Sequence, residues 1–148
     1  MNILIPLDGS DASHDTLRWA IATLDKTANR YCLLSVVPQP LVPEYDVSLG
    51  VENARDILSE GRHMLEEAGC VVSHSEYVFG DPADRICRYA EETPIDQVLM
   101  GSHGRSGLLK AFLGSASEGV LEHCKKPVFI YRSAQKGRVA AAFSGSRT

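Results

Sequence analysis

Glycines and small hydroxyl side chains are concentrated between residues 100 and 121, in the stretch MGSHGRSGLLKAFLGSASEGVL. Gly101, Gly104 and Gly107 can adopt positive φ angles and let the backbone approach a ligand closely. Gly114 then precedes residues 115–117 (Ser-Ala-Ser), a typical helix start, where the first amides lack partners within the helix. Those amides and the helix dipole favour an anion such as phosphate. The segment therefore predicts a phosphate-binding loop that leads into a helix N-terminus.

Cationic and hydroxyl side chains in the same segment suit this chemistry. Arg105 and Lys110 can add positive charge near a phosphate, and the hydroxyls of Ser115 and Ser117 can donate to its oxygens. An alternative stays open, because Ser115 and Glu118 have the spacing of a capping box, in which both side chains satisfy their own helix. A carboxylate at Glu118 also opposes a phosphate unless it points away. Neither a Walker-type P-loop nor a G-x-G-x-x-G dinucleotide fingerprint is present.

The rest of the chain alternates short apolar runs with helical patterns. Strands are predicted at 2–7, 31–37, 71–79, 96–100 and 127–131, and helices after Ser10, between about Ser48 and Ala68, from Pro82 to before Pro94, and over 115–124. The third strand is the most polar and suits a sheet edge. This alternation predicts an α/β fold, a mainly parallel sheet with helices on both faces. Ligands of such sheets bind beyond the carboxyl ends of the strands, where the phosphate-binding loop is expected.

Composition limits the functions to consider. The chain has 148 residues, 44% of them apolar, and a formal net charge of −4. The length suits one domain, and the acidic balance argues against duplex nucleic acid as the main ligand. No apolar run approaches the roughly 20 residues of a membrane span. The start of the chain lacks the features of a signal peptide, and the four cysteines have no metal-ligand spacing. We therefore expect a cytoplasmic protein with reduced thiols.

The combined motifs resemble a known family. Gly101-x-x-Gly104, nine residues and Gly114-Ser115 match the G-2x-G-9x-G-(S/T) pattern of the ATP-binding branch of universal stress proteins. The resemblance covers about residues 1–132 and includes IPLDGS, LLSVV, GDPADRI and KKPVFIYR. It implies an open five-stranded parallel sheet in the order 3-2-1-4-5, of the adenine nucleotide alpha hydrolase-like kind. Residues 133–148 form a basic C-terminal tail beyond the resemblance, which we expect to be loosely ordered.

The resemblance also implies a nucleotide site. Its residues are Pro6, Leu7, Asp8, Val36, Met100, Gly101, Ser102, His103, Gly104, Arg105, Ser106, Gly107, Gly114, Ser115, Ala116 and Ser117. Those up to Gly101 would border adenine and ribose, residues 103–107 would wrap the phosphates, and residues 114–117 would hold phosphate oxygens. The protein alone would make no metal site. Mg²⁺ would arrive with ATP, ADP or AMP, and Asp8 could help to hold it through water.

Several of these residues have ordinary structural alternatives. Asp8 can cap the first helix, His103 can be an exposed loop histidine, and Arg105 can pair with a surface acid. Val36 belongs at least partly to the apolar core. These alternatives stay open at the level of sequence.

The resemblance implies a homodimer that pairs the last strand, Val128–Tyr131, across a two-fold axis, which would cover a sheet edge prone to aggregation. The function it implies is that of an ATP-binding regulatory protein of the stress response, with little or no catalysis and no catalytic residue assigned. Two alternatives remain. One is a slow ATP hydrolase in which His103 or Asp8 orients water, and the other is an interaction module that binds no nucleotide.

Overall fold

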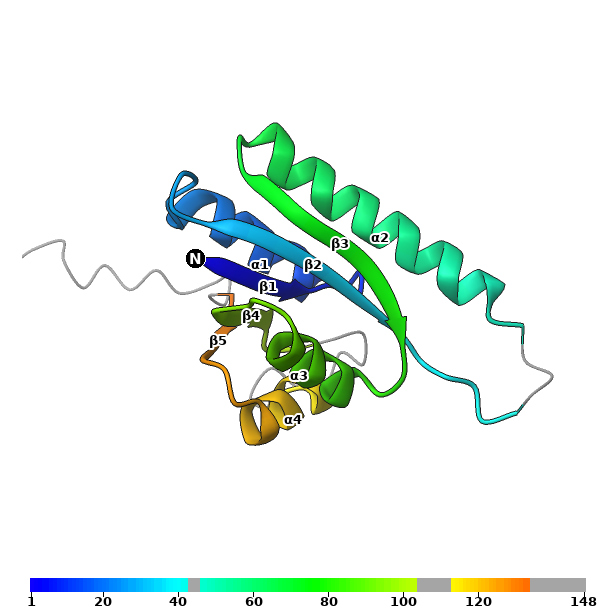
Figure 1. Ribbon diagram of the computed structural model, residues 1–148. Coiled ribbons are helices and arrows are strands. Elements are labelled where there is room, and N and C mark those ends of the chain that lie inside the picture. Colours follow the sequence, from blue (N-terminus) through cyan, green and yellow to red (C-terminus); the bar gives the residue numbers. More distant parts are fainter. Residues whose placement is uncertain (43–45, 104–112, 134–148) are drawn as a thin grey trace, which may run out of the picture.

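A five-stranded parallel sheet in the order β3-β2-β1-β4-β5 forms the centre of the molecule (Figure 1). The computed structural model describes residues 1–42, 46–103 and 113–133. Within these ranges the strands are β1 (Asn2–Pro6), β2 (Arg30–Val37), β3 (Val71–Phe79), β4 (Gln97–Gly101) and β5 (Val128–Tyr131). The helices are α1 (Asp11–Thr23), α2 (Ser48–Glu67), α3 (Pro82–Glu92) and α4 (Ser115–His123). The predicted fold class and strand order are confirmed.

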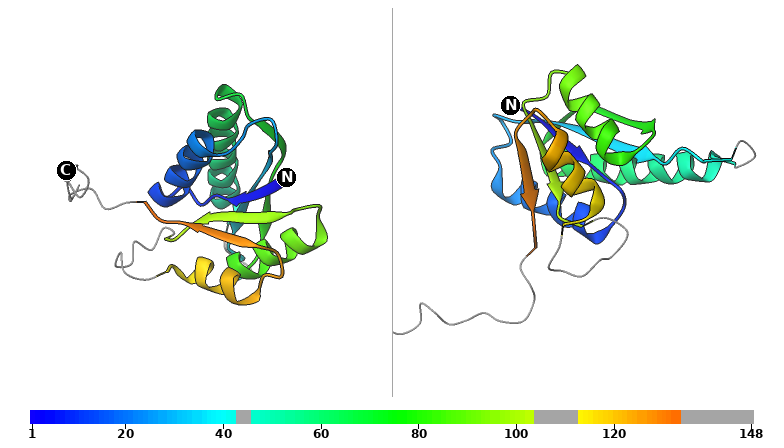
Figure 2. Two further views of the ribbon diagram at one scale, coloured as in Figure 1. Left: turned by 90° about the vertical axis from the view of Figure 1, so that its left-hand side faces the viewer. Right: turned by 90° about the horizontal axis from the view of Figure 1, so that it is seen from below.

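The sheet lies between two helical layers, as Figure 2 shows. Successive side chains of a strand point to opposite faces. Ile3 and Ile5 of β1 therefore pack against α1 and α2, whereas Leu4 packs against α3 and α4, and all three are fully buried. Burial on both faces explains why β1 and β4 are apolar runs without polar alternation.

Local signals in the sequence set the helix ends. Ser10 caps α1, and its hydroxyl accepts from the amide of Ser13 at 3.2 Å. Asp81 caps α3 in the same way, and Pro82 is the first helical residue, as predicted. Gly69 ends α2 with a φ of 86°, and its amide donates to the Glu66 carbonyl at 3.0 Å. A positive φ at this position favours glycine, so the end of α2 could be predicted.

The two edges of the sheet differ in character. The polar strand β3 forms one edge, as its side chains predicted. At the other edge, Trp19 of α1 stacks on Phe129 and Tyr131 of β5, with ring centroids 5.1 and 5.5 Å apart. Phe129 remains 44% exposed. Among the described residues no helix has the length and apolar character required to cross a bilayer.

Candidate functional site

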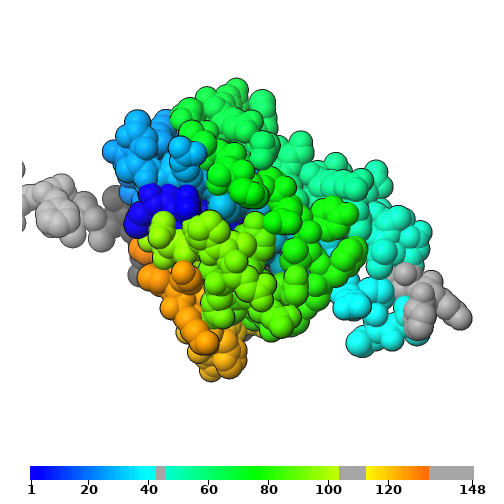
Figure 3. All heavy atoms as spheres, viewed as in Figure 1, coloured from blue at the N-terminus to red at the C-terminus, as the bar shows by residue number. Residues whose placement is uncertain are grey.

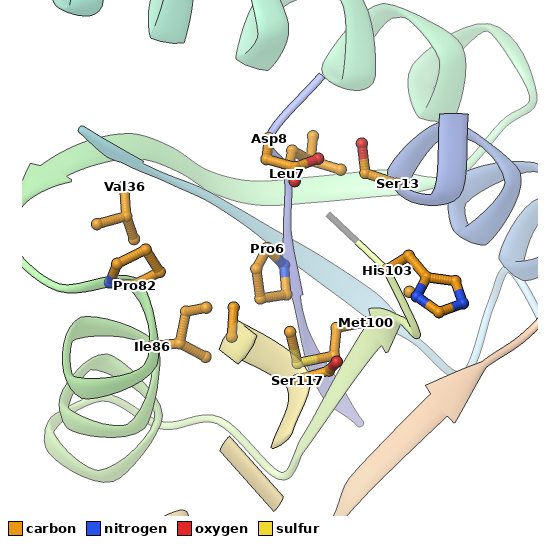
Figure 4. Close-up of a pocket in the computed structure, with 12 residues that line it drawn as sticks. Pro6, Leu7, Asp8, Ser13, Val36, Pro82, Ile86, Met100, His103 and Ser117 are labelled. Carbon is orange, nitrogen blue, oxygen red and sulfur yellow. The ribbon is translucent and has the colours of Figure 1, made fainter. Parts of the chain in front are cut away.

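A pocket of about 120 Å³ opens at the carboxyl ends of β1 and β4, beside the end of β2 (Figure 4). A single water needs about 10–15 Å³, so the pocket can hold a ring-sized part of a ligand. Its lining comprises Pro6, Leu7, Asp8, Ser13, Val36, Pro82, Ile86, Met100, Gly101, His103, Ala116 and Ser117. The structure thus brings together Asp8 and Gly101, which are far apart in the sequence.

The strand order explains why a pocket forms here. β1 pairs with β2 on one side and with β4 on the other. The chain leaves β1 toward β2 and β3, then returns across the sheet to β4 and β5. The connections after β1 and β4 therefore diverge to opposite faces, and a crevice remains between them. The crevice lies at the carboxyl ends of the strands, where the glycine-rich segment was expected to bind phosphate.

One side of the pocket is apolar. Val36 of β2 lies beside Pro82 and Ile86 of α3, and Met100 of β4 lies to the right of Ile86 in Figure 4. Ile86 and Met100 are only 3% and 6% exposed, so both side chains are fixed by the core. Apolar walls of this kind can receive the face of a flat ring.

The opposite side of the pocket is polar, and Asp8, Ser13 and His103 lie there (Figure 4). The Asp8 carboxylate accepts from the Ser10 amide at 2.9 Å, while Gly9 between them has a φ of 79°. Since Ser10 is the N-cap of α1, Asp8 stabilises the turn before the helix and does not cap the helix itself. The Nδ1 atom of His103 is buried and has no hydrogen-bond partner within the described part of the chain. It is a polar atom that a ligand could satisfy.

The start of α4 tests the capping-box alternative. Gly114 is the N-cap, and none of the described side chains caps the helix. Ser115 is therefore already helical, and it does not form the predicted box with Glu118. A helix leaves its first amides without intrahelical partners. Ala116 and Ser117, which carry two of these amides, line the pocket. The capping-box alternative is wrong for this helix.

Two buried serines join the end of β4 to this helix. The Ser117 hydroxyl lies 2.9 Å from the Ser102 carbonyl and 3.0 Å from the Gly114 carbonyl, and donates to them. The Gly114 amide donates to the same Ser102 carbonyl at 2.7 Å. We expected the Ser117 hydroxyl and the Gly114 amide to donate to phosphate. Here both are engaged within the protein, so Ser102, Gly114 and Ser117 position the helix start.

Gly101 is required for a reason other than the predicted one. We expected it to allow a positive φ and a close approach of the backbone to a ligand. The described glycines with positive φ are Gly9, Gly69 and Gly80, and Gly101 is not among them. A Cβ at Gly101 would lie 3.0 Å from the carbonyl oxygen of Ala12. The glycine is therefore needed for the close approach of β4 to the first turn of α1, which positions the polar side of the pocket.

The structure adds three lining residues that the sequence analysis did not assign: Ser13, Pro82 and Ile86. They lie near the starts of α1 and α3, close to the strand ends. A helix that follows a strand in such a fold starts at this edge, which is a signal that sequence reasoning could have used. Gly104, Arg105, Ser106, Gly107 and Lys110 lie outside the described residues, so their expected roles remain predictions.

Fold and pocket together define a class: an open parallel α/β protein with a ligand pocket at the point where the strand order reverses. The model of the universal stress protein family matches residues 1–132. The chain therefore belongs to the universal stress protein family.

Similar proteins span nearly the same length. Universal stress protein MJ0531 of Methanocaldococcus jannaschii is 32% identical over 142 residues, which cover 90% of this chain and 83% of the relative. The solved structure of MJ0577, from the same organism, superposes with a TM-score of 0.77 at 30% identity and covers 90% of this chain and 96% of its own. A universal stress protein family protein from Arabidopsis thaliana with AMP bound has a TM-score of 0.71 at 16% identity, with coverages of 90% and 92%. At this low identity the likeness shows the fold alone.

Proposed function

We propose that this protein binds an adenine nucleotide, ATP or a related adenosine phosphate, in the pocket between β1 and β4. The observation that carries the proposal is the start of α4, which no described side chain caps and which opens onto a pocket with an apolar far wall. One end of the pocket suits a negatively charged group, and the other suits a flat ring. A nucleotide is a ligand that has both. The plant relative with AMP bound supports this choice.

The base would lie against Val36, Ile86 and Met100, where removal of apolar surface from water favours binding. The phosphates would extend toward the amides of residues 115–117. Each favourable charge at a helix N-terminus contributes about 0.3–1 kcal/mol, and the loop glycines and Arg105 would add further contacts. Mg²⁺ would enter with the phosphates, near Asp8, because it retains several waters and needs few protein oxygens.

Binding would regulate the protein in the stress response, with little or no catalysis. A ligand that binds only the native state stabilises it, and a nucleotide here would tie α4 to β1 and β4. Slow hydrolysis is the second candidate, favoured by the Nδ1 atom of His103, which lies at the pocket and has no hydrogen-bond partner among the described residues. We propose in addition a homodimer through β5, since Phe129 is exposed on an edge strand.

The decisive experiment changes the charge at an exposed site of the helix start. Ser115 is exposed and is the first residue of α4, so Ser115→Asp adds a negative charge where the helix itself accepts an acid. The same charge repels a phosphate. With Mg-ATP we expect Ser115→Asp to bind at least about tenfold more weakly than wild type, a difference of about 1.4 kcal/mol. Asparagine has nearly the same shape as aspartate and carries no charge. The affinity of Ser115→Asn for Mg-ATP should therefore be within a few-fold of that of wild type.

Calorimetric titration and thermal unfolding would both report this difference. At a nucleotide concentration of about 100 Kd, linkage stabilises the native state by about 2.7 kcal/mol and raises the Tm of wild type and Ser115→Asn. The unliganded Tm of Ser115→Asp checks that its fold is intact. No Tm rise in wild type at millimolar Mg-ATP would refute nucleotide binding and favour the interaction module.

A further inference from the structure

Two of the four thiols are in contact where α3 meets α4. Cys87 lies in α3 and is 7% exposed, and its thiol is close enough to that of Cys124 for the two groups to interact. Cys124 is the C-cap residue of α4 and is partly exposed. Both side chains pack in the hydrophobic core between the sheet and these two helices. All four cysteines are free thiols.

Contacts other than the thiols set this juxtaposition. Glu91, one turn after Cys87 on α3, accepts the amide of Lys125 at 3.1 Å. At the other end of the helix pair, a Cβ at Gly119 would lie 2.7 Å from that of Ala83, so the two helices approach closely. A disulfide needs such close approach, because its Cα atoms lie about 4.4–6.8 Å apart. The two cysteines are thus flanked on either side by close contacts between α3 and α4.

We propose that Cys87 and Cys124 are a modification site, at which hydrogen peroxide forms a reversible intramolecular disulfide between α3 and α4. The Cys124 thiolate, the more accessible of the two, attacks the peroxide oxygen and becomes a sulfenic acid, while the other oxygen leaves as water after it takes up a proton. Cys87 sulfur then attacks the Cys124 sulfur. The S–S bond forms, and the displaced hydroxide leaves as water with the Cys87 proton. Two thiols are oxidised, and one hydrogen peroxide is reduced to two waters.

The remaining thiols are placed less favourably. Cys32 is 6% exposed and its sulfur contacts the Ser73 hydroxyl at 3.2 Å. Cys70 lies on the opposite face of the sheet, at the end of α2. The Cys87–Cys124 bond would hold α3 and α4 as one unit. The first turns of both helices line the pocket, although disulfide formation does not depend on nucleotide binding.

Mass spectrometry of the full-length protein tests the proposal. The reduced protein is treated with hydrogen peroxide at mildly alkaline pH, because burial, Cys124, Glu91 and Asp84 raise the pKa of Cys87 to about 11. Free thiols are then alkylated, and the protein is digested with trypsin without reduction. Cleavage sites in the sequence release Cys87 in peptide 86–88 and Cys124 in peptide 111–125. We expect these two peptides joined, with the loss of two hydrogen atoms, and separated again by dithiothreitol.

Single substitutions distinguish a disulfide of the Cys87–Cys124 pair from reactions of the other thiols. Cys124→Ser, at a partly exposed helix end, should remove the joined peptides, whereas Cys70→Ser should retain them. The oxidised wild type should unfold at a higher temperature than the reduced form, and Cys124→Ser should show no such rise. Cross-links that involve Cys32 or Cys70, or a Cys124 oxidised to sulfinic acid beside an unreacted Cys87, would overturn the proposal. The wild-type peptide map decides the matter even if a variant fails to fold.

Discussion

Ser102 and Ser117 show how single residues prepare the pocket without offering their polar atoms to a ligand. Both are almost completely buried, and the Ser117 hydroxyl and the Gly114 amide converge on the Ser102 carbonyl. A buried hydrogen bond of this kind contributes about 1 kcal/mol to stability. The Ser117 side chain bonds back to the end of β4, and Ser117 and Ala116 both line the pocket. The two serines thus position the start of α4 beside the pocket.

His103 is the residue at which binding and hydrolysis can be separated. Its Nδ1 atom is buried without a partner among the described residues, so a bound nucleotide would satisfy it. We expect His103→Ala to weaken Mg-ATP binding by up to about tenfold, the loss of one hydrogen bond. His63→Ala, at a side chain that is 77% exposed on α2, should bind as wild type does.

Turnover measurements on the same variants decide the second candidate function. If the protein only binds nucleotide, phosphate release from wild type should equal that from Ser115→Asp, which binds poorly. Release above that background, abolished in His103→Ala while affinity is kept, would make the protein a slow hydrolase and contradict the regulatory proposal.

Among the elements, β4 and α1 approach each other closely beside the pocket. A methyl group at Gly101 would lie 3.0 Å from the Ala12 carbonyl oxygen and 3.1 Å from the Ala12 Cβ. Backbone cannot move aside cheaply, so Gly101→Ala should destabilise the fold by about 1–3 kcal/mol. For a chain of this size, each kcal/mol lowers the Tm by about 2–4 °C.

A double variant that combines Gly101→Ala with Ala12→Gly tests which atom of Ala12 causes the strain. Ala12→Gly removes the Cβ contact but leaves the carbonyl oxygen, so the double variant should regain only part of the lost Tm. Full recovery would show that the methyl groups alone collide. An unchanged Tm in Gly101→Ala would mean that β4 and α1 can separate, and Gly101 would then have no packing role.

At the level of strands and helices, much of the architecture could be predicted from the sequence. Apolar runs alternating with helical patterns indicated each strand and helix, and the end of α2 followed from Gly69, where a positive φ favours glycine. The strand order came from the family resemblance, because local patterns carry no information on which strands pair. The sequence did not identify Ser13 and Ile86 as pocket residues, because their positions depend on how α1 and α3 pack. Sequence also left Gly114 and Ser115 undecided as the N-cap, because both residue types occur there.

For the whole molecule, the two sheet edges are not equivalent. The end of α4 and β5, coloured orange in Figure 3, lie at one margin of the molecule. There Trp19, the single tryptophan, covers the aromatic side chains of β5 on the α1 face, yet Phe129 stays 44% exposed. The opposite edge, β3, carries His74, Ser75 and Glu76. An apolar edge strand invites pairing, whereas a polar one discourages it.

The proposed homodimer therefore predicts different outcomes for matched changes at the two edges. Antiparallel pairing of β5 about a two-fold axis would bring both copies of Phe129 near the axis, so Phe129→Glu would place like charges across the interface and favour monomers. Val71→Glu, at a residue 47% exposed on β3, introduces the same charge at the edge left free. Sedimentation equilibrium at micromolar concentration should give a dimer for wild type and Val71→Glu, and a monomer for Phe129→Glu. Far-UV circular dichroism would check that the Phe129→Glu monomer remains folded. A monomeric wild type would end the proposal, and a dimer lost only in Val71→Glu would move the interface to β3.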